Sequence, residues 1–333
     1  MNGHPRRLPH LQHPSGGGSQ SGGCDIAFMS LSLKNVIQQA EQIILGKPQQ
    51  IRFALTCLLA RGHLLIEDLP GVGKTTLAHV LARSLGLHFQ RIQFTSDLLP
   101  ADILGVSVYQ RDSSKFEFHP GPIFAQMVLA DEINRATPKA QSALLEAMEE
   151  QQVTIEGTTR ALPAPFFVIA TQNPSNHLGT FPLPESQLDR FLMRIQMGYP
   201  DARAERGLLS GVDRREIISQ LKPQMESNEL LALQKRVRDV FVSPALLDYV
   251  QAILRHTRES ARHTHGLSPR AGLALLAAAR AWALLHERDA VIPEDVQAVL
   301  PGVTSHRLQV VGEHSKQSSD MLARELIKAV TIP

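Results

Sequence analysis

Residues 63–85 place a short apolar run directly before a loop with two glycines, and this loop opens into a stretch of helical character. The apolar run, 63–67, predicts a buried strand. Gly71 and Gly73 allow backbone N–H groups to close around an anion, and Lys74 follows them where the helix starts. A strand, a glycine loop and a helix in this order are typical of a phosphate-binding loop.

The strict form of that pattern, G-x-x-x-x-G-K-[ST], is broken at one position, where this chain has Asp68 instead of glycine. We still expect Lys74 to meet the β- and γ-phosphates of a nucleotide and Thr75 to ligate Mg²⁺. The alternative is a glycine-rich strand–turn–helix corner without a ligand. The predicted nucleotide-binding residues are Pro70, Gly71, Val72, Gly73, Lys74, Thr75 and Thr76.

A second signal lies at the end of the apolar run 127–130, which is followed by Asp131 and Glu132. Downstream of a phosphate loop, the first carboxylate is placed to orient Mg²⁺. The second, one residue farther out, is placed to polarise an attacking water. The alternative is a solvated strand end with incidental acidic residues.

Asn173 comes shortly after another apolar run, 166–170. An amide at this place can fix the attacking water or the γ-phosphate. It can equally be a turn-forming residue before Pro174, because asparagine before proline is common in turns. The residues alone leave these two interpretations open.

Strands that alternate with helices predict an α/β fold with a parallel sheet, whose ligand lies at the carboxyl ends of the strands. The predicted strands are 63–67, 89–94, 127–130, 166–170 and 192–196. Residues 95–126 are predicted to be irregular, with β-prone pieces at 106–109 and 115–118. A small hairpin is predicted over 152–162.

The domain organisation follows from a change in pattern near residue 200. The P-loop ATPase core is predicted over 29–200, where Ser32 caps the first helix and Gly62 ends the second. A smaller, all-helical domain is predicted over 201–333, with one helix opened by Pro293 and closed by Pro301 and Gly302. Residues 1–28, rich in Gly, Ser, Pro and His, are predicted to be a disordered N-terminal extension.

Composition excludes several classes of protein. Lys and Arg total 34 against 32 for Asp and Glu, and this net charge of +2 gives no electrostatic footprint for nucleic acid or an anionic membrane. Two cysteines, Cys24 and Cys57, are too few for a disulfide framework. No apolar stretch is long enough to insert into a membrane, and we expect a cytoplasmic protein.

With these residues in hand, the chain resembles a MoxR-type AAA+ ATPase from about residue 33 to the C-terminus. The motifs that carry the resemblance are EDLPGVGKTT (67–76), LADEINRATPKAQSALLEAMEE (129–150), TQNP (171–174), LPESQLDRF (183–191) and SPRA (268–271). Asp68 is similar to what this family carries. The chain departs from the family at 175–178, where relatives tend to be acidic.

The resemblance implies roles that spacing does not give. Asn173 resembles sensor 1, Arg190 the arginine finger that reaches a neighbouring subunit, and Arg270 sensor 2 on the helical lid. The resemblance leaves open whether Arg270 acts on its own nucleotide or a neighbour's. Simpler alternatives are a surface ion pair between Asp189 and Arg190, and a solvated Arg270. Residues 95–126 resemble the helix-2 insert of this clade and 152–162 its pre-sensor hairpin.

The function that the resemblance implies is an ATP-hydrolysing, Mg²⁺-dependent motor, a hexameric ring that remodels or matures protein complexes as a chaperone does. A protein with a von Willebrand factor A domain is the implied partner. One rival is a nucleic-acid motor similar to a helicase, which the balanced charge of both hairpins disfavours. The other is a regulatory scaffold that binds ATP and hardly hydrolyses it.

Overall fold

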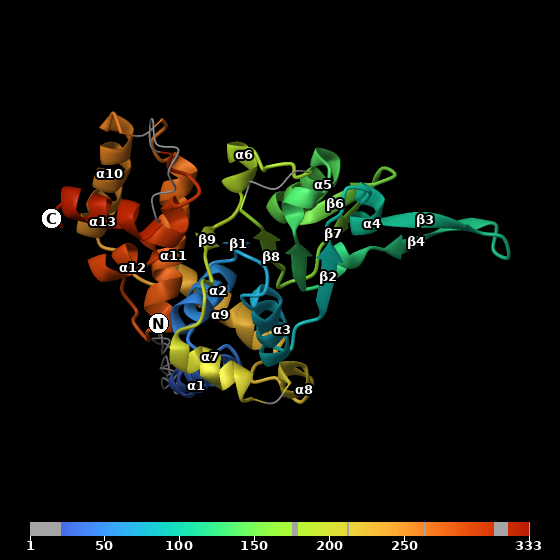
Figure 1. Cartoon of the computed structure of the whole chain (residues 1–333), viewed down its shortest axis with the longest axis horizontal. Coiled ribbons are helices and arrows are strands. Elements are labelled where there is room, and N and C mark those ends of the chain that lie inside the picture. The colour runs from blue at the N-terminus through green and yellow to red at the C-terminus, as the bar shows by residue number, and fades with distance from the viewer. Residues whose placement is uncertain (1–20, 175–178, 212, 263, 310–318, 333) are drawn as a thin grey trace, which may run out of the picture.

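The computed structural model describes residues 21–174, 179–211, 213–262, 264–309 and 319–332, so the divergent segment 175–178 lies outside the described residues. The predicted α/β class is confirmed: a five-stranded sheet lies centrally, and a group of helices lies to one side of it (Figure 1). The strands of this sheet are β1 (Leu64–Glu67), β2 (Phe89–Gln93), β5 (Met127–Asp131), β8 (Phe167–Gln172) and β9 (Met193–Ile195).

The five strands are parallel and run in the order β2-β5-β8-β1-β9. The central strands β5, β8 and β1 are buried almost throughout, whereas β2 at one edge is largely exposed. Continuous apolar runs suit strands that are covered on both faces. Gln93 pairs with Asp131, and Glu67 pairs with Gln172, so the carboxyl ends of β2, β5, β8 and β1 form one edge.

Alternate residues of the strands face two apolar clusters. Leu64 and Ile66 belong to the cluster that includes helices α1 (Ser21–Ile43), α2 (Pro48–Leu59) and α3 (Lys74–Ser84). Leu65 belongs to the cluster that includes α5 (Pro138–Glu150) and the short helix α4 (Pro100–Leu104). This alternation is the period of two that a strand imposes on its side chains. Helices therefore cover both faces of the sheet (Figure 1).

Two hairpins leave the sheet. Strands β3 (Gly105–Gln110) and β4 (Lys115–Pro120) form a long arm that projects from the body (Figure 1). Strands β6 (Gln152–Ile155) and β7 (Thr158–Ala161) form the second hairpin, and the Arg160 guanidinium lies 4.0 Å from the centre of the Phe118 ring of the first. Residues 95–126, predicted to be largely irregular, thus contain a helix, a hairpin and a 3-10 turn, η1 (Pro122–Phe124).

The chain after the sheet is helical, apart from an isolated bridge between Phe241 and Ala290 in the described residues. The short elements between the strands are η2 (Ile133–Arg135), after β5, and α6 (Glu185–Leu188), before β9, and the short helices after the sheet are α7 (Ala202–Leu209) and α8 (Arg214–Ser219). The larger helices are α9 (Ser227–Asp239), α10 (Pro244–Glu259), α11 (Pro269–Leu285), α12 (Pro293–Thr304) and α13 (Ser319–Ala329). Their apolar residues continue the cluster beneath the sheet, so the two parts share one core.

The first helix begins earlier than the sequence predicts. Helix α1 starts at Ser21, and Ser32 is buried within it rather than capping it. Residues 21–28 of the predicted extension are therefore helical, and residues 1–20 lie outside the described part of the chain. The segment 24–31, CDIAFMSL, contains neither glycine nor proline, so it has no residue that would end the helix.

The end of α2 also differs from the prediction. Arg61, not Gly62, adopts the left-handed conformation (φ 57°), and the N–H groups of both residues bond back to the last turn of the helix. A Cβ atom on Gly62 would lie 2.4 Å from the Cβ of Leu192. Glycine is therefore required at 62 by the close approach of the segment that enters β9.

Pro301 and Gly302 do not close α12, which continues to Thr304. A proline inside a helix removes one hydrogen bond, and here the Pro301 carbonyl still accepts from the Ser305 N–H at 3.2 Å. Gly302 lies close to the Met193 side chain of β9. A Cβ atom added to Gly302 would lie 3.3 Å from the Met193 sulfur. No helix in the described residues is both long and apolar enough to cross a membrane.

Candidate active site

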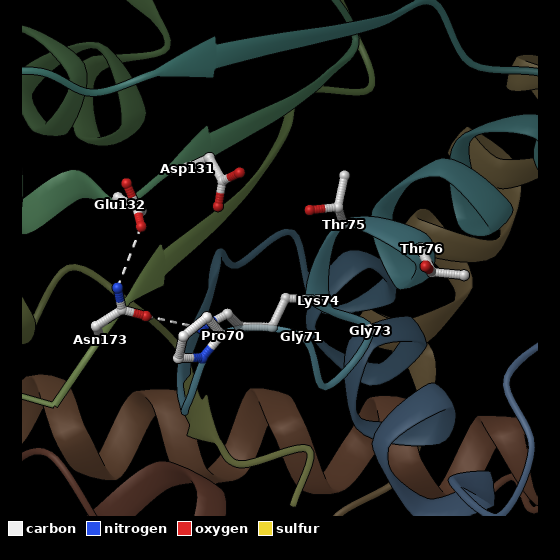
Figure 2. A pocket seen from close by; sticks show the side chains of 9 residues that line it. All are labelled: Pro70, Gly71, Gly73, Lys74, Thr75, Thr76, Asp131, Glu132 and Asn173. Atoms are coloured by element: carbon white, nitrogen blue, oxygen red, sulfur yellow. Dashed lines mark hydrogen bonds between the residues drawn. The ribbon is translucent and has the colours of Figure 1, made fainter. Parts of the chain in front are cut away.

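An open pocket of about 290 Å³ lies at the carboxyl edge of the sheet, where β1, β5 and β8 end (Figure 2). All but one of the predicted nucleotide-binding residues line it, and so do both predicted Mg²⁺ ligands and two of the predicted catalytic residues. The lining residues are Pro70, Gly71, Gly73, Lys74, Thr75, Thr76, Asp131, Glu132 and Asn173. Val72 is partly buried against the core instead.

The loop after β1 owes its shape to two glycines. Gly71 has φ 85° and Gly73 has φ 96°, a region in which other residues are strained. A Cβ atom on either glycine would meet nothing within 4 Å, so the backbone angle and not the space requires glycine. Gly73 lies at the N-cap of α3, and the unpaired N–H groups of a helix start attract an anion.

The contacts of Asp68 explain why the loop keeps its shape although this position breaks the strict phosphate-loop pattern. Its carboxylate accepts hydrogen bonds from the Leu69 N–H at 2.7 Å and the Gly198 N–H at 2.6 Å, and its own N–H donates to the Gln172 carbonyl. These contacts join the start of the loop to β8 and to the segment after β9. Asp68 is not among the residues with positive φ, so the position does not need glycine.

Lys74 is nearly buried, with 8% of its surface exposed. Its ammonium group donates to the Asp68 carbonyl at 2.5 Å and to the Asn173 Oδ1 at 3.3 Å. Burial lowers the pKa of Lys74, while the negative charges of Asp68, Asp131 and Glu132 oppose this shift. The cation is thus held at the base of the pocket, where an added phosphate would contact it.

Asp131 is 7% exposed, and both of its carboxylate oxygens are bound. The Thr171 hydroxyl donates to Oδ1 at 2.5 Å, and the Arg91 guanidinium donates to Oδ2 at 2.6 and 3.1 Å. Thr75 faces Asp131 across the pocket (Figure 2). A carboxylate and a hydroxyl are hard oxygen donors of the kind that Mg²⁺ prefers, and phosphate and water oxygens commonly supply the rest of its shell. The residues therefore fit this cation.

Glu132 follows Asp131 in a left-handed conformation (φ 56°, ψ 48°), which aims its side chain away from the strand. Its Oε2 accepts from Arg135 at 2.7 Å and from Gln93 at 2.9 Å. Its Oε1 accepts from the Asn173 amide at 3.1 Å. Three donors hold the carboxylate at the pocket wall.

The amide of Asn173 connects the two halves of the pocket. Its oxygen accepts from Lys74 and its nitrogen donates to Glu132, as the dashed lines in Figure 2 show. Its backbone carbonyl accepts from the buried Asn134 amide at 3.3 Å. The geometry thus places this side chain in the pocket, which the turn interpretation does not require.

Arg190 and Arg270 do not line this pocket. They lie in a separate groove of about 370 Å³ between the end of α5 and the start of α11. Arg190 Nε lies 2.8 Å from Oε2 of Glu149, and Arg270 donates to the other oxygen of the same carboxylate. The local pair between Asp189 and Arg190 does not form in the structure. Asp189 instead binds Arg307 at 2.6 Å.

Sequence reasoning did not identify several side chains that hold the site. Arg91 and Gln93 come from β2, Thr171 from β8, and Arg135 from η2. The available signal was that Gln93 and Thr171 are polar residues at the carboxyl ends of predicted strands, where parallel strands meet, and that Arg91 lies two residues before Gln93 on the same face of its strand. Their partners depend on the strand order, which the sequence does not state.

Comparisons with known proteins agree with this geometry. The family model described as "ATPase family associated with various cellular activities (AAA)" matches residues 63–193. The model described as "AAA lid domain" matches residues 255–328.

Three similar proteins cover almost the whole chain. The "Uncharacterized protein YeaC" of Bacillus subtilis (strain 168) is 45% identical over 303 residues, which span 90% of this chain and 95% of the relative. The "Chaperone MoxR1" of Mycobacterium tuberculosis is 39% identical over 335 residues, spanning 97% of this chain and 88% of the relative. A solved structure of a putative ATPase from Cytophaga hutchinsonii has a TM-score of 0.87 and 35% identity, covering 94% of this chain and 98% of the other.

Proposed function

Because the chain belongs to the MoxR family of AAA+ ATPases, we propose that it is an ATP-hydrolysing, Mg²⁺-dependent motor. In this proposal it assembles as a hexameric ring in the cytoplasm and remodels or matures protein complexes, with a partner that contains a von Willebrand factor A domain. Residues 29–200 bind and hydrolyse the nucleotide, and residues 201–333 form the lid. The name "chaperone" carried by one relative supports the type of work.

The observation that carries the proposal is the amide of Asn173 between Lys74 and Glu132. In the proposed mechanism, Lys74 and the N–H groups of the glycine loop bind the β- and γ-phosphates. Thr75 and Asp131 would hold Mg²⁺, which neutralises phosphate charge when bound. Glu132 takes the proton of the attacking water, and Asn173 orients that water against the γ-phosphate.

The position of the two arginines supports a ring. Neither Arg190 nor Arg270 lines the nucleotide pocket of its own chain. A guanidinium that stabilises charge on the γ-phosphate is worth on the order of 10³-fold or more in rate. We propose that Arg190 as arginine finger, and Arg270 as sensor 2, act on the nucleotide of a neighbouring subunit. The proposal therefore assigns Arg270 to the neighbour's nucleotide, one of the two alternatives that the sequence leaves open.

Mixing two inactive variants tests this arrangement. Arg190→Ala keeps an intact pocket but lacks the finger, and Lys74→Ala keeps the finger but lacks the phosphate contact. We expect each variant alone to hydrolyse ATP poorly, and the mixture to recover part of the wild-type rate at concentrations where rings are seen. A silent mixture with normal rings would contradict action between subunits.

A further inference from the structure

The groove that holds Arg190 and Arg270 is organised around one carboxylate, that of Glu149. Each of its oxygens contacts a different arginine: Oε2 lies 2.8 Å from Nε of Arg190, and Oε1 accepts a hydrogen bond from a terminal nitrogen of Arg270. The end of α5, the turn after α6 and the start of α11 therefore meet at this side chain. Glu149 is 121 residues from Arg270 in the sequence, so the contact is purely tertiary.

A second carboxylate anchors this arrangement to the core. Asp189 lies 4.0 Å from Nε of Arg270 and accepts at 2.6 Å from Arg307. Arg307 has a side chain only 5% exposed, and it also donates to the backbone carbonyls of Phe191 and Leu192. Burial lowers the pKa of Arg307, and the charge of Asp189 opposes the shift. Arg270 thus lies next to a carboxylate that the buried Arg307 holds in place.

The place of Glu149 in its own helix gives no reason for a carboxylate. It lies in the last turn of α5, a turn without basic residues, and the helix dipole disfavours negative charge there. The neighbouring Glu150 is exposed and forms no ion pair within the described part of the chain. The charge of Glu149 is therefore compensated across the groove, by the two arginines, and not along the helix.

The groove keeps a surplus of positive charge. Its four arginines are opposed by two carboxylates among the residues that line it, namely Arg61, Arg190, Arg270 and Arg307 against Glu149 and Asp189. Such a groove attracts an anion from outside the chain. Glu149 consequently brings the arginines together without cancelling their combined charge.

We infer that Glu149 is a positioning residue for hydrolysis in the neighbouring subunit: it holds Arg190 and Arg270 side by side, so that both guanidinium groups reach the same triphosphate. The inference rests on the proposed function, in which these arginines act across a subunit interface. Arginine side chains that are already ordered lose less rotamer freedom when they contact the charge that develops on the neighbour's γ-phosphate in the transition state. Arg190 is held through Nε, the guanidinium nitrogen nearest its aliphatic stem.

The first test compares Glu149→Gln with Glu150→Gln as a matched control. We expect Glu149→Gln to lower kcat about 10- to 100-fold, since a misplacement of about 1 Å can cost this much. Its KM for ATP and its nucleotide affinity should stay at the wild-type values, because its own pocket is intact. Glu149→Asp keeps the charge on a shorter stem, so its kcat should lie between that of Glu149→Gln and that of the wild type. Glu150→Gln should match the wild type.

The second test assigns Glu149 to a face of the subunit by mixing variants. Glu149→Gln mixed with Lys74→Ala should recover activity, because one supplies a pocket and the other supplies positioned arginines. Glu149→Gln mixed with Arg190→Ala should not exceed the activity of the two variants measured separately, because both damage the same face. Recovery in the second mixture would place the effect of Glu149 in its own pocket and overturn the inference.

Two further results would also overturn it: a Glu149→Gln rate equal to that of Glu150→Gln, or a rate above the wild type, which would mean that the carboxylate restrains the arginines. The mixture of Arg190→Ala with Lys74→Ala separates this inference from the proposed function. If that mixture recovers and the Glu149 pattern fails, only the positioning role is wrong. If Glu149→Gln does not assemble, Glu149→Asp is mixed in its place, with ring assembly and melting temperature as controls.

Discussion

In the proposed mechanism, the single carboxylate of Glu132 separates a pocket that hydrolyses ATP from one that only binds it. Glu132 is held by Arg135, Gln93 and Asn173, all through its side-chain oxygens. An amide in its place keeps the size of the side chain but cannot take a proton from water. The residue therefore tests the motor against the rival of a regulatory scaffold.

We expect Glu132→Gln to keep Mg-ATP binding and to lower turnover by a factor on the order of 10² or more. Lys74→Ala should instead weaken the binding itself, because in the proposed mechanism Lys74 contacts the phosphates directly. Nucleotide affinity by titration and turnover by phosphate release distinguish the two. Turnover that survives in Glu132→Gln would show that another group accepts the proton. Unchanged affinity in Lys74→Ala would contradict the phosphate-loop assignment.

Also at the scale of single residues, the neutral ring of His63 connects the start of β8 to the end of α5. Its Nδ1 accepts from the Val168 N–H at 3.0 Å, so Nε2 carries the proton and faces the Met148 carbonyl at 3.3 Å. Burial lowers the pKa of His63 to about 4 from its ordinary 6.5. The unfolded chain thus takes up a proton near pH 6.5, whereas the folded chain does not do so until about pH 4.

Stability should therefore fall as the pH falls from 6.5 to 4, and the contribution of His63 to this loss is about 3 kcal/mol. We expect His63→Asn, which keeps an acceptor for the Val168 N–H, to be less stable at pH 7 and to lose less free energy of unfolding on acidification. Denaturant titrations at pH 7 and pH 4.5 measure both quantities. His306, whose pKa burial also lowers, contributes equally to both proteins. Equal acid losses would refute the assignment to His63.

At the scale of elements, the turn between α2 and β1 gives Arg61 and Gly62 roles that differ from those expected from the sequence. Arg61 carries the left-handed conformation that glycine usually takes, and Gly62 provides the close contact with Leu192. We expect Gly62→Ala to destabilise the protein by about 1–3 kcal/mol through overpacking. Arg61→Gly should be neutral or stabilise by up to about 1 kcal/mol, because it relieves the positive φ.

Thermal unfolding of both variants measures this prediction. The two changes lie at adjacent positions of one turn, so each serves as the control of the other. Destabilisation by Arg61→Gly together with a neutral Gly62→Ala would contradict both assignments, namely the backbone strain at Arg61 and the close contact at Gly62.

At the scale of the whole molecule, charge argues against a nucleic-acid substrate. The projecting hairpin β3–β4 carries Arg111 and Lys115 against Asp112 and Glu117. In the second hairpin, Arg160 lies over the Phe118 ring. The exposed aromatic pair Tyr109 and Phe116, with ring centres 5.4 Å apart, offers a surface for apolar groups. Nucleic-acid motors gain most of their affinity from clustered Lys and Arg, which neither hairpin has.

We therefore expect the ATPase rate to be indifferent to single- and double-stranded DNA and RNA at about 50 and about 200 mM salt, the range over which phosphate contacts weaken steeply. Candidate protein partners should stimulate it. A pull-down with the Glu132→Gln variant, read by mass spectrometry, identifies such partners. Strong stimulation by nucleic acid that falls as salt rises would favour the helicase-like rival.

Much of the site could be predicted because it is local in the sequence. The glycine loop between 67 and 76, and the pair Asp131 and Glu132 after an apolar run, need only the order of residues and the periodicity of strands. The same reasoning predicted five strands and the helices after residue 200. Its errors lie where helix ends depend on packing, at Ser32, Gly62 and Pro301.

The tertiary structure decided which atoms meet. Asn173 faces Lys74 and Glu132 only because β8 lies between β1 and β5, and this strand order is not written in the residues. Arg190 and Arg270 converge on Glu149 across 41 and 121 positions of chain, away from the phosphate loop. Contacts of such separation follow from the packing of whole elements, because local preferences in the sequence act only over a few residues.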